Sequence, residues 1–247
     1  MKTLMTSLLL ASIIAPTFAA EKDTRCFEMR IYYAAPGKLD DLQARFRNHT
    51  LKLFEKHGMT NLGYWVPLEN PENKLIYLLA YPSREAREKA WKAFGADPAW
   101  QAAWKASEAN GKLVTKAEVK FLAATDYSPY VKASAQDPER CFELRTYTAA
   151  PGKLADLNSR FRDHTLALFA KHGMTSVGYW TPTDKGSENT LIYILAHKSK
   201  EAAKASFDAF REDPAWVAVK KASETNGVLA AKVESVFMKP TDYSPAK

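Results

Sequence analysis

Two stretches of this sequence are near-copies of each other: Cys26-Phe-Glu-Met-Arg-Ile-Tyr32 and Cys141-Phe-Glu-Leu-Arg-Thr-Tyr147. The similarity extends through residues 25–67 and 140–182, which align without a gap and are identical at 31 of 43 positions. The rest of each copy is less similar, with 30 identities in 56 positions. A repeat of this length indicates one structural unit encoded twice, so two copies of a single module are predicted.

Both copies show the same order of predicted elements. The first strand alternates apolar and polar residues, the first helix has an apolar stripe at helical spacing, and the third strand is apolar throughout. In the first copy, strands are predicted at 26–33, 59–66, 74–81 and 116–122, and helices over 38–57, from Ser83 and from Asp97. This β-α-β-β-α-β order is the ferredoxin-like pattern, an α+β fold.

A ferredoxin-like sheet carries helices on one face only, so its other face has to be covered. Two modules packed through their bare sheet faces cover each other. We therefore expect a pseudo-dimeric α/β barrel formed within one chain, a monomer with an internal pseudo-two-fold axis. The first module is predicted at 24–129, a polar linker at 130–139 and the second module at 140–245.

The N-terminus has a different character. Lys2 is followed by the apolar run Leu8–Ala15, by Pro16 and by small residues at Thr17 and Ala19. This pattern is typical of a secretory signal peptide over 1–19, with a mature chain that starts near Ala20. The apolar run is too short to span a bilayer, so no stable membrane anchor is expected. An exported, periplasmic or secreted protein is predicted.

Composition limits the classes of function. The chain has 247 residues, of which 46% are hydrophobic and 26% charged, which suits a globular protein with a real core. The formal net charge is +7, but Lys and Arg alternate with Asp and Glu along the predicted helices. No nucleic-acid partner is therefore expected. No Walker A, GxGxxG, GxSxG, CxxC or HExxH pattern occurs, so no cofactor or metal site is predicted.

The two cysteines, Cys26 and Cys141, occupy equivalent positions in the two copies. In an exported protein they could form a disulfide, provided that the two first strands run side by side. The alternative is that both are buried strand residues that act as small hydrophobic side chains. We favour the second interpretation.

The first strand supplies the main candidate site. Phe27, Met29 and Ile31 are expected to face the helices, which would direct the alternate, polar side chains into the barrel interior. The last strand should be its antiparallel neighbour. The residues expected to gather on this inner face are Glu28, Arg30, Tyr32 and Glu118, with Glu143, Arg145, Tyr147 and Glu234 from the second copy.

Two interpretations of this cluster remain open. In one, Arg30 or Arg145 binds an anionic group and Tyr32 or Tyr147 orients it. In the other, the Arg and Glu side chains pair with each other and tie the two sheets together. The second is favoured, because a neighbouring Glu would compete with an anionic ligand.

Histidines and tryptophans add further candidates. His49 and His164 lie beside the apolar stripe of the first helix. A pair of such histidines could bind a metal or haem or act as a general base, although packing at the rim of the core is commoner. Trp65 and Trp180 end the second strands. Each could stack on a flat ligand at the barrel mouth or fill the interior.

Five motifs occur in the same order in both copies; in the first copy these are Cys26–Tyr32, Pro36-Gly-Lys, Lys56-His-Gly-Met, Gly63-Tyr-Trp and Asp97-Pro-Ala-Trp100. This ordered set resembles the NIPSNAP domain. The resemblance implies a dimeric α/β-barrel fold, a superfamily that includes small-molecule monooxygenases, haem-degrading enzymes and stress-response barrels. It supplies no agreed catalytic residues. It also implies interaction or trafficking roles in mitochondria, which an exported chain does not share.

Taken together, these features favour an exported binding or interaction protein, with a small molecule or a protein as partner, rather than an enzyme. The alternative is a small-molecule enzyme of the dimeric-barrel type, a cofactor-independent or haem-using monooxygenase. An interior cavity lined by Arg30, Tyr32 and Trp65 would favour a ligand site, and a filled interior would exclude one there.

Overall fold

In a computed structural model of the chain, residues 22–135 and 139–247 are described. The predicted signal peptide, 1–19, lies outside these residues, as do 136–138 of the predicted linker. The first module contains β1 (Cys26–Ala34), α1 (Leu39–Arg45), a π-helical turn (Phe46–Thr50), α2 (Leu51–Lys56), β2 (Thr60–Pro67), β3 (Lys74–Tyr81), α3 (Arg84–Ala96), α4 (Pro98–Ser107) and β4 (Val114–Ala124). The second contains β5 (Cys141–Ala149), α5 (Leu154–Arg160), a π-helical turn (Phe161–Thr165), α6 (Leu166–Lys171), β6 (Thr175–Pro182), β7 (Thr190–His197), α7 (Lys200–Glu212), α8 (Pro214–Ser223) and β8 (Ala230–Pro240).

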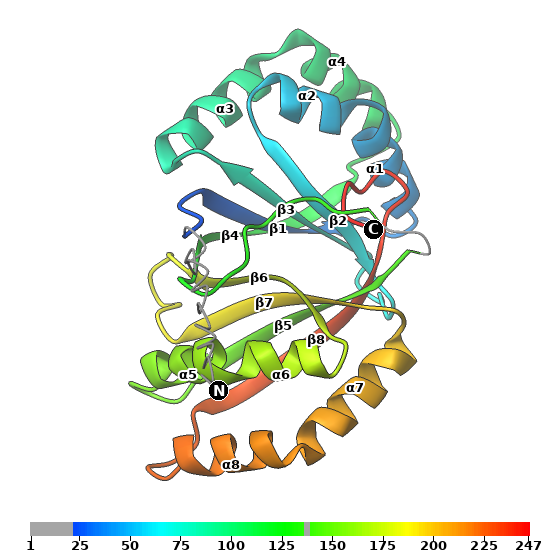
Figure 1. The fold of residues 1–247 in the computed structure, drawn as a ribbon. Helices are drawn as coiled ribbons and strands as arrows, with labels where there is room; N and C mark the ends of the chain where they lie inside the picture. The colour runs from blue at the N-terminus through cyan, green and yellow to red at the C-terminus, as the bar shows by residue number, and fades with distance from the viewer. Residues whose placement is uncertain (1–21, 136–138) are drawn as a thin grey trace, which may run out of the picture.

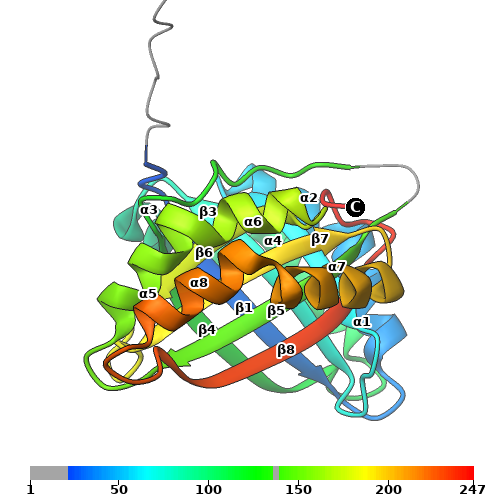
Figure 2. The same ribbon diagram turned by 60° about the horizontal axis from the view of Figure 1, so that its bottom comes forward.

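The eight strands close into one antiparallel barrel, which confirms the predicted fold. Their order is β1-β3-β2-β8-β5-β7-β6-β4. Each module contributes four consecutive strands, and the modules join edge to edge at two seams, β2 with β8 and β4 with β6. The helices of the first module cover one side of the barrel and those of the second cover the opposite side (Figures 1 and 2).

The barrel interior is a packed apolar core. Phe27 and Met29 of β1 lie in one buried cluster with Phe142 and Leu144 of β5, and Ile31 packs against it. The predicted orientation of the first strands was therefore wrong. The apolar row points inward because the closed interior excludes water on every side, whereas the polar row lies under the helices.

Trp65 and Trp180 fill this interior rather than standing at its mouth. Each is about 1% exposed or less, and each ring folds over the glycine two residues before it. Phe142 packs on Trp65, and Phe27 on Trp180, with ring centroids 5.4 and 5.7 Å apart. The part of the interior around the two indoles is therefore filled by side chains, and neither indole is placed to stack on a ligand at the barrel mouth.

The segment after the last strand of each module crosses to the other module. Ser128 Oγ accepts from the Tyr179 backbone N–H, and Ser244 Oγ accepts from that of Tyr64. Val131 of the predicted linker is buried in the core of the barrel, although a polar tether was expected. In Figure 1 the red C-terminal segment lies beside α1 of the first module. These exchanged tails close the seams from outside.

Cys26 and Cys141 are both free. The condition for a disulfide is not met, because three strands separate β1 from β5 in either direction around the barrel. Each cysteine is half-buried, and burial raises the pKa of both thiols.

Among the described residues, no helix is both long and apolar enough to cross a membrane.

Candidate functional site

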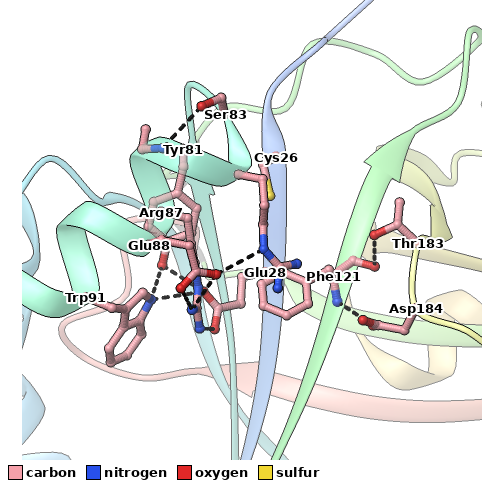
Figure 3. A network of polar contacts seen from close by, with 12 residues as sticks. Cys26, Glu28, Tyr81, Ser83, Arg87, Glu88, Trp91, Phe121, Thr183 and Asp184 are labelled. Carbon is pink, nitrogen blue, oxygen red and sulfur yellow. Dashed lines mark hydrogen bonds and ion pairs between the residues drawn. The ribbon is translucent and has the colours of Figure 1, made fainter.

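The polar side chains of β1 gather beneath α3 in the first module (Figure 3). Glu28 is fully buried and accepts hydrogen bonds from Arg30 at 2.6 Å and from Arg87 Nε and Nη2 at 3.0 and 2.8 Å. Tyr81 Oη and Trp91 Nε1 donate to it at 2.9 and 3.0 Å. Five bonds satisfy the carboxylate, so its charge is paired internally, as the sequence favoured. The network connects β1 to α3 of the same module, however, and does not tie the two sheets together as expected.

The electrostatics of this network keep Glu28 ionised. Burial raises its pKa, but the hydrogen bonds from Arg87 and the charge of Arg30 outweigh burial and hold the pKa below its ordinary value. The Arg30 guanidinium also lies 4.3 Å from the centroid of the Trp91 ring. The cluster fixes α3 against the sheet.

The second copy has the same carboxylate with different partners. Glu143 accepts from Arg145 at 2.5 Å, from Ser235 at 2.6 Å and from His197 Nε2 at 3.1 Å. Burial raises the pKa of Glu143, but the hydrogen bond from His197 and the charge of Arg145 outweigh burial. The pKa of Glu143 therefore lies below its ordinary value. The two clusters lie under different helices, so they do not form the joint site that was expected.

Two of the predicted members lie elsewhere. Glu118 pairs with Ile31, so it shares the interior side of the sheet, and it accepts from Tyr33 Oη at 2.9 Å. Glu234 is exposed and forms an ion pair with Lys232 at 2.9 Å. Glu118 and Glu234 are thus on the interior face predicted for the last strands. They are separated from Glu28 and Glu143 because only the face assignment of the first strands was inverted.

A cavity of 220 Å³ lies between the helices and the sheet of the first module. Tyr32 belongs to its lining, as does Ala117 of β4. Most of its wall is aromatic: Tyr32, Phe46, Phe54, Trp91, Phe94, Trp100 and Trp104. The polar lining groups are Arg45, Thr50 and Glu108, and Arg45 is bound to Glu108 at 3.3 Å. Of the residues predicted for a ligand site, only Tyr32 lines this cavity.

The π-helical turn shapes this cavity. The sequence predicted one continuous helix over 38–57, but the helix widens at Phe46–Thr50. Thr50 Oγ1 donates to the Arg45 carbonyl oxygen at 3.2 Å, and both residues line the cavity. π-helical turns in α-helices often occur at functional sites. The second module has the same turn at Phe161–Thr165, so it belongs to the module design.

An outer groove adjoins the cavity. It has a volume of 660 Å³ and shares Trp100, Trp104 and Glu108 with the inner cavity, so α4 forms the wall between them. Trp104 is 49% exposed, which is unusual for so large an apolar side chain. Its equivalent in the second module is Lys220, so this exposed indole is specific to the first copy, whereas the other six aromatic positions of the wall are aromatic in both copies.

The predicted histidine candidates face outward. His49 and His164 lie on the π-helical turns and are exposed. His57 and His172 make more definite contacts, since their Nε2 atoms lie 2.8 Å from Asp97 and Asp213, the N-caps of α4 and α8. Within the described residues, no group of His, Cys, Asp and Glu has the arrangement of a metal site.

The comparisons with known proteins agree with this architecture. A family model described as NIPSNAP matches residues 27–129 and 142–245, which is most of the chain. The chain belongs to the NIPSNAP family. The resemblance noted from the sequence motifs is thereby confirmed, twice within one chain. No match is found among curated proteins.

Solved structures share the fold of this NIPSNAP protein. One is described as a "putative monooxygenase" from Lactobacillus acidophilus, with 13% identity, a TM-score of 0.59 and coverage of 88% of this chain and 94% of that chain. An anthrone oxidase-like protein has 12% identity and a TM-score of 0.59, with coverage of 94% and 98%. A NIPSNAP family protein from Agrobacterium tumefaciens has 24% identity and a TM-score of 0.39, and aligns with 43% of this chain and 98% of its own. At these identities the first two similarities establish the fold alone.

Sequence reasoning missed most of the cavity in the first NIPSNAP module. Phe46 and Phe54 fit the apolar stripe predicted for the first helix, and no site residue was predicted in the helices that begin at Ser83 and Asp97. The difference in sequence between the copies was the available signal. Trp91 and Trp104 have Phe207 and Lys220 as equivalents, which indicates that the two modules use this region differently.

Proposed function

We propose that this NIPSNAP protein is a binding protein that holds a small aromatic molecule under the helices of its first module. The supporting observation is the 220 Å³ cavity with seven aromatic residues in its wall. A dry apolar cavity of about 150 Å³ is large enough for benzene, so a molecule of one or two rings fits this space. The exposed Trp104 and the outer groove provide room for a polar substituent.

The contacts favour a ligand that is mainly apolar with one polar end. Aromatic walls bind flat rings through edge and face contacts. Arg45 and Glu108 already pair with each other at one side of the cavity, so a neutral donor or acceptor such as a phenol hydroxyl suits them better than a full charge. The Thr50 hydroxyl also lines the cavity and is a further hydrogen-bonding group for the polar end of the ligand.

A cavity-filling substitution tests the proposal. Ala117→Phe adds a ring to the cavity, whereas Val233→Phe makes the equivalent change in the second module. With 2-naphthol as probe, quenching of tryptophan fluorescence should saturate for the unaltered protein and for V233F, and should weaken at least tenfold for A117F. Equal binding by a folded A117F protein would contradict the proposal.

A second candidate function is oxidation of an aromatic substrate in the same cavity. It is favoured by the whole-chain fold similarity to proteins described as a "putative monooxygenase" and as anthrone oxidase-like. The discriminating measurement is oxygen uptake with an anthrone as substrate. Turnover that A117F abolishes and V233F retains would establish an enzyme, while tight binding without oxygen uptake would leave the binding function.

We also propose that the protein is exported and that residues 1–19 are removed. Asp23 and Arg25 make the first described contacts, with each other and with Val131, so a chain that starts at Ala20 retains them. The intact mass of protein from the periplasmic or culture fraction should correspond to Ala20–Lys247. Recovery of a chain that retains Met1–Ala19 from the cytoplasm alone would contradict export.

A further inference from the structure

The two modules differ in what lies against their buried glutamates. In the first module, the Arg87 side chain occupies the space beside Glu28 and donates two hydrogen bonds to it. Ala203 stands at the equivalent position of α7. The second module therefore has the same buried carboxylate without this arginine, and Ser235 and His197 bind Glu143 instead.

A pocket occupies this place in the second module. Its volume is 490 Å³, and its lining includes Glu143 and Arg145 of β5 together with Phe207 of α7 and Ser235 and Phe237 of β8. Arg145 is mostly buried, with 15% of its side chain exposed, and its guanidinium carbon lies 4.6 Å from the Phe207 ring centroid. The pocket thus combines a buried guanidinium with two aromatic side chains.

The charge of the lining also differs between the copies. Lys204 replaces Glu88, and Arg211 replaces Gly95. The pocket is lined by the cations Arg145, Lys200, Lys204 and Arg211 and by the anions Glu143 and Glu201. The equivalent positions of the first copy carry two cations, Arg30 and Arg84, and three anions, Glu28, Glu85 and Glu88. The pocket of the second module is therefore suited to a negative ligand.

Existing ion pairs leave this charge available. Lys204 and Arg211 both pair with Asp208, and Lys200 pairs with Glu69 of the first module. These side chains are between 45% and 85% exposed, and exposed pairs contribute little and rearrange readily. An anionic ligand can therefore form ion pairs with Lys204 and Arg211 at the rim of the pocket.

We propose that this pocket binds a small organic anion, a carboxylate on an apolar body. The apolar body packs between Phe207 and Phe237, and the carboxylate meets the cationic side chains of α7. In the first module, the Arg87 side chain closes the same place. In the second copy, the glutamate itself stays buried, and the loss of this arginine leaves the pocket beside it. This proposal is independent of the aromatic cavity in the first module.

The test is titration of the ¹⁵N-labelled mature protein with naphthalene-2-carboxylate, followed by NMR. The backbone amide signals of Lys204, Ser235 and Phe237 should shift and saturate. The uncharged naphthalene-2-carboxamide should bind at least tenfold more weakly, and added salt should weaken the carboxylate alone. Equal affinity for the two compounds, or shifts confined to the first module, would overturn the proposal.

Two variants of α7 locate the site. Ala203→Arg introduces the side chain that closes the first copy and should weaken carboxylate binding at least tenfold. Ala205→Arg adds the same charge at an exposed position of the same helix and should keep binding within twofold. If A203R fails to fold, Lys204→Glu restores the charge of the first copy and should weaken binding several-fold. Unchanged binding by a folded A203R or K204E would contradict the proposal.

Discussion

Gly63 shows how a single residue sets the barrel interior. Glycine is required there because the indole of Trp65 folds back over it, and a Cβ at this position would lie 2.2 Å from two of the ring carbons. Gly178 and Trp180 repeat the arrangement in the second module. Two large rings thus fill a space that strands alone would leave hollow. This close approach is why Gly-Tyr-Trp recurs in both copies.

Gly63→Ala is expected to destabilise the protein by about 2 kcal/mol or more, because overpacking forces the indole off its position. Gly95→Ala is the control, since a Cβ there meets nothing within 4 Å. That change lies in α3 and should be neutral or stabilising by up to about 1 kcal/mol. Both are measured by urea unfolding. A G63A protein as stable as the unaltered one would refute the proposed role of the glycine.

At the scale of elements, a carboxylate joins two helices in each module. Asp97 caps α4 through Oδ1, which accepts from the Ala99 N–H at 2.9 Å, while Oδ2 accepts from Lys56 at 2.6 Å and contacts His57 at 2.8 Å. The hydrogen bonds from Lys56 and His57 hold the pKa of Asp97 well below its ordinary value. The sequence placed His57 near the end of its helix but did not reveal this contact.

Asp97→Asn and Asp97→Ala separate the two roles of this residue. Asparagine retains a capping oxygen, so D97N should lower the Tm less than D97A, which removes both the cap and the ion pairs. Because the folded pKa of Asp97 is lowered, its charge stabilises the protein above about pH 4 and this contribution is lost as the pH falls further. The deficit of D97N relative to the unaltered protein should therefore shrink on acidification. A constant deficit from pH 7 to pH 3 would contradict this.

At the scale of the whole molecule, the duplication supplies the second half of a barrel. The two seams, the shared core and the exchanged tails are all contacts between modules. Arg162 binds Asp126 of the first tail, and Arg47 binds Asp242 of the second. Each module thus holds the tail of the other through an equivalent Arg–Asp ion pair. A lone module would expose the seam edges of β2 and β4 and its share of the apolar interior.

Residues 22–135 expressed alone are therefore expected to form a symmetric homodimer, in which each tail crosses to the other copy. Arg47 would then meet Asp126 of its partner, in place of Asp242. Light scattering should give twice the mass of the fragment, and removal of residues 125–135 should weaken the dimer. A stable, folded monomer of the fragment would show that one sheet does not need the other.

The sequence alone determined the repeat, the order of elements, the caps at Ser83 and Asp97 and the family, because these follow from local pattern and spacing. It did not determine which face of β1 points inward, since alternation defines two faces without saying which one water reaches. Only closure of the barrel decided that Phe27 is interior and that Glu28 lies under the helices. Likewise, the sequence shows that Ala203 of the second copy stands at the position equivalent to Arg87. That the exchange opens a pocket follows only from the tertiary structure, which brings β5, α7 and β8 together around Glu143.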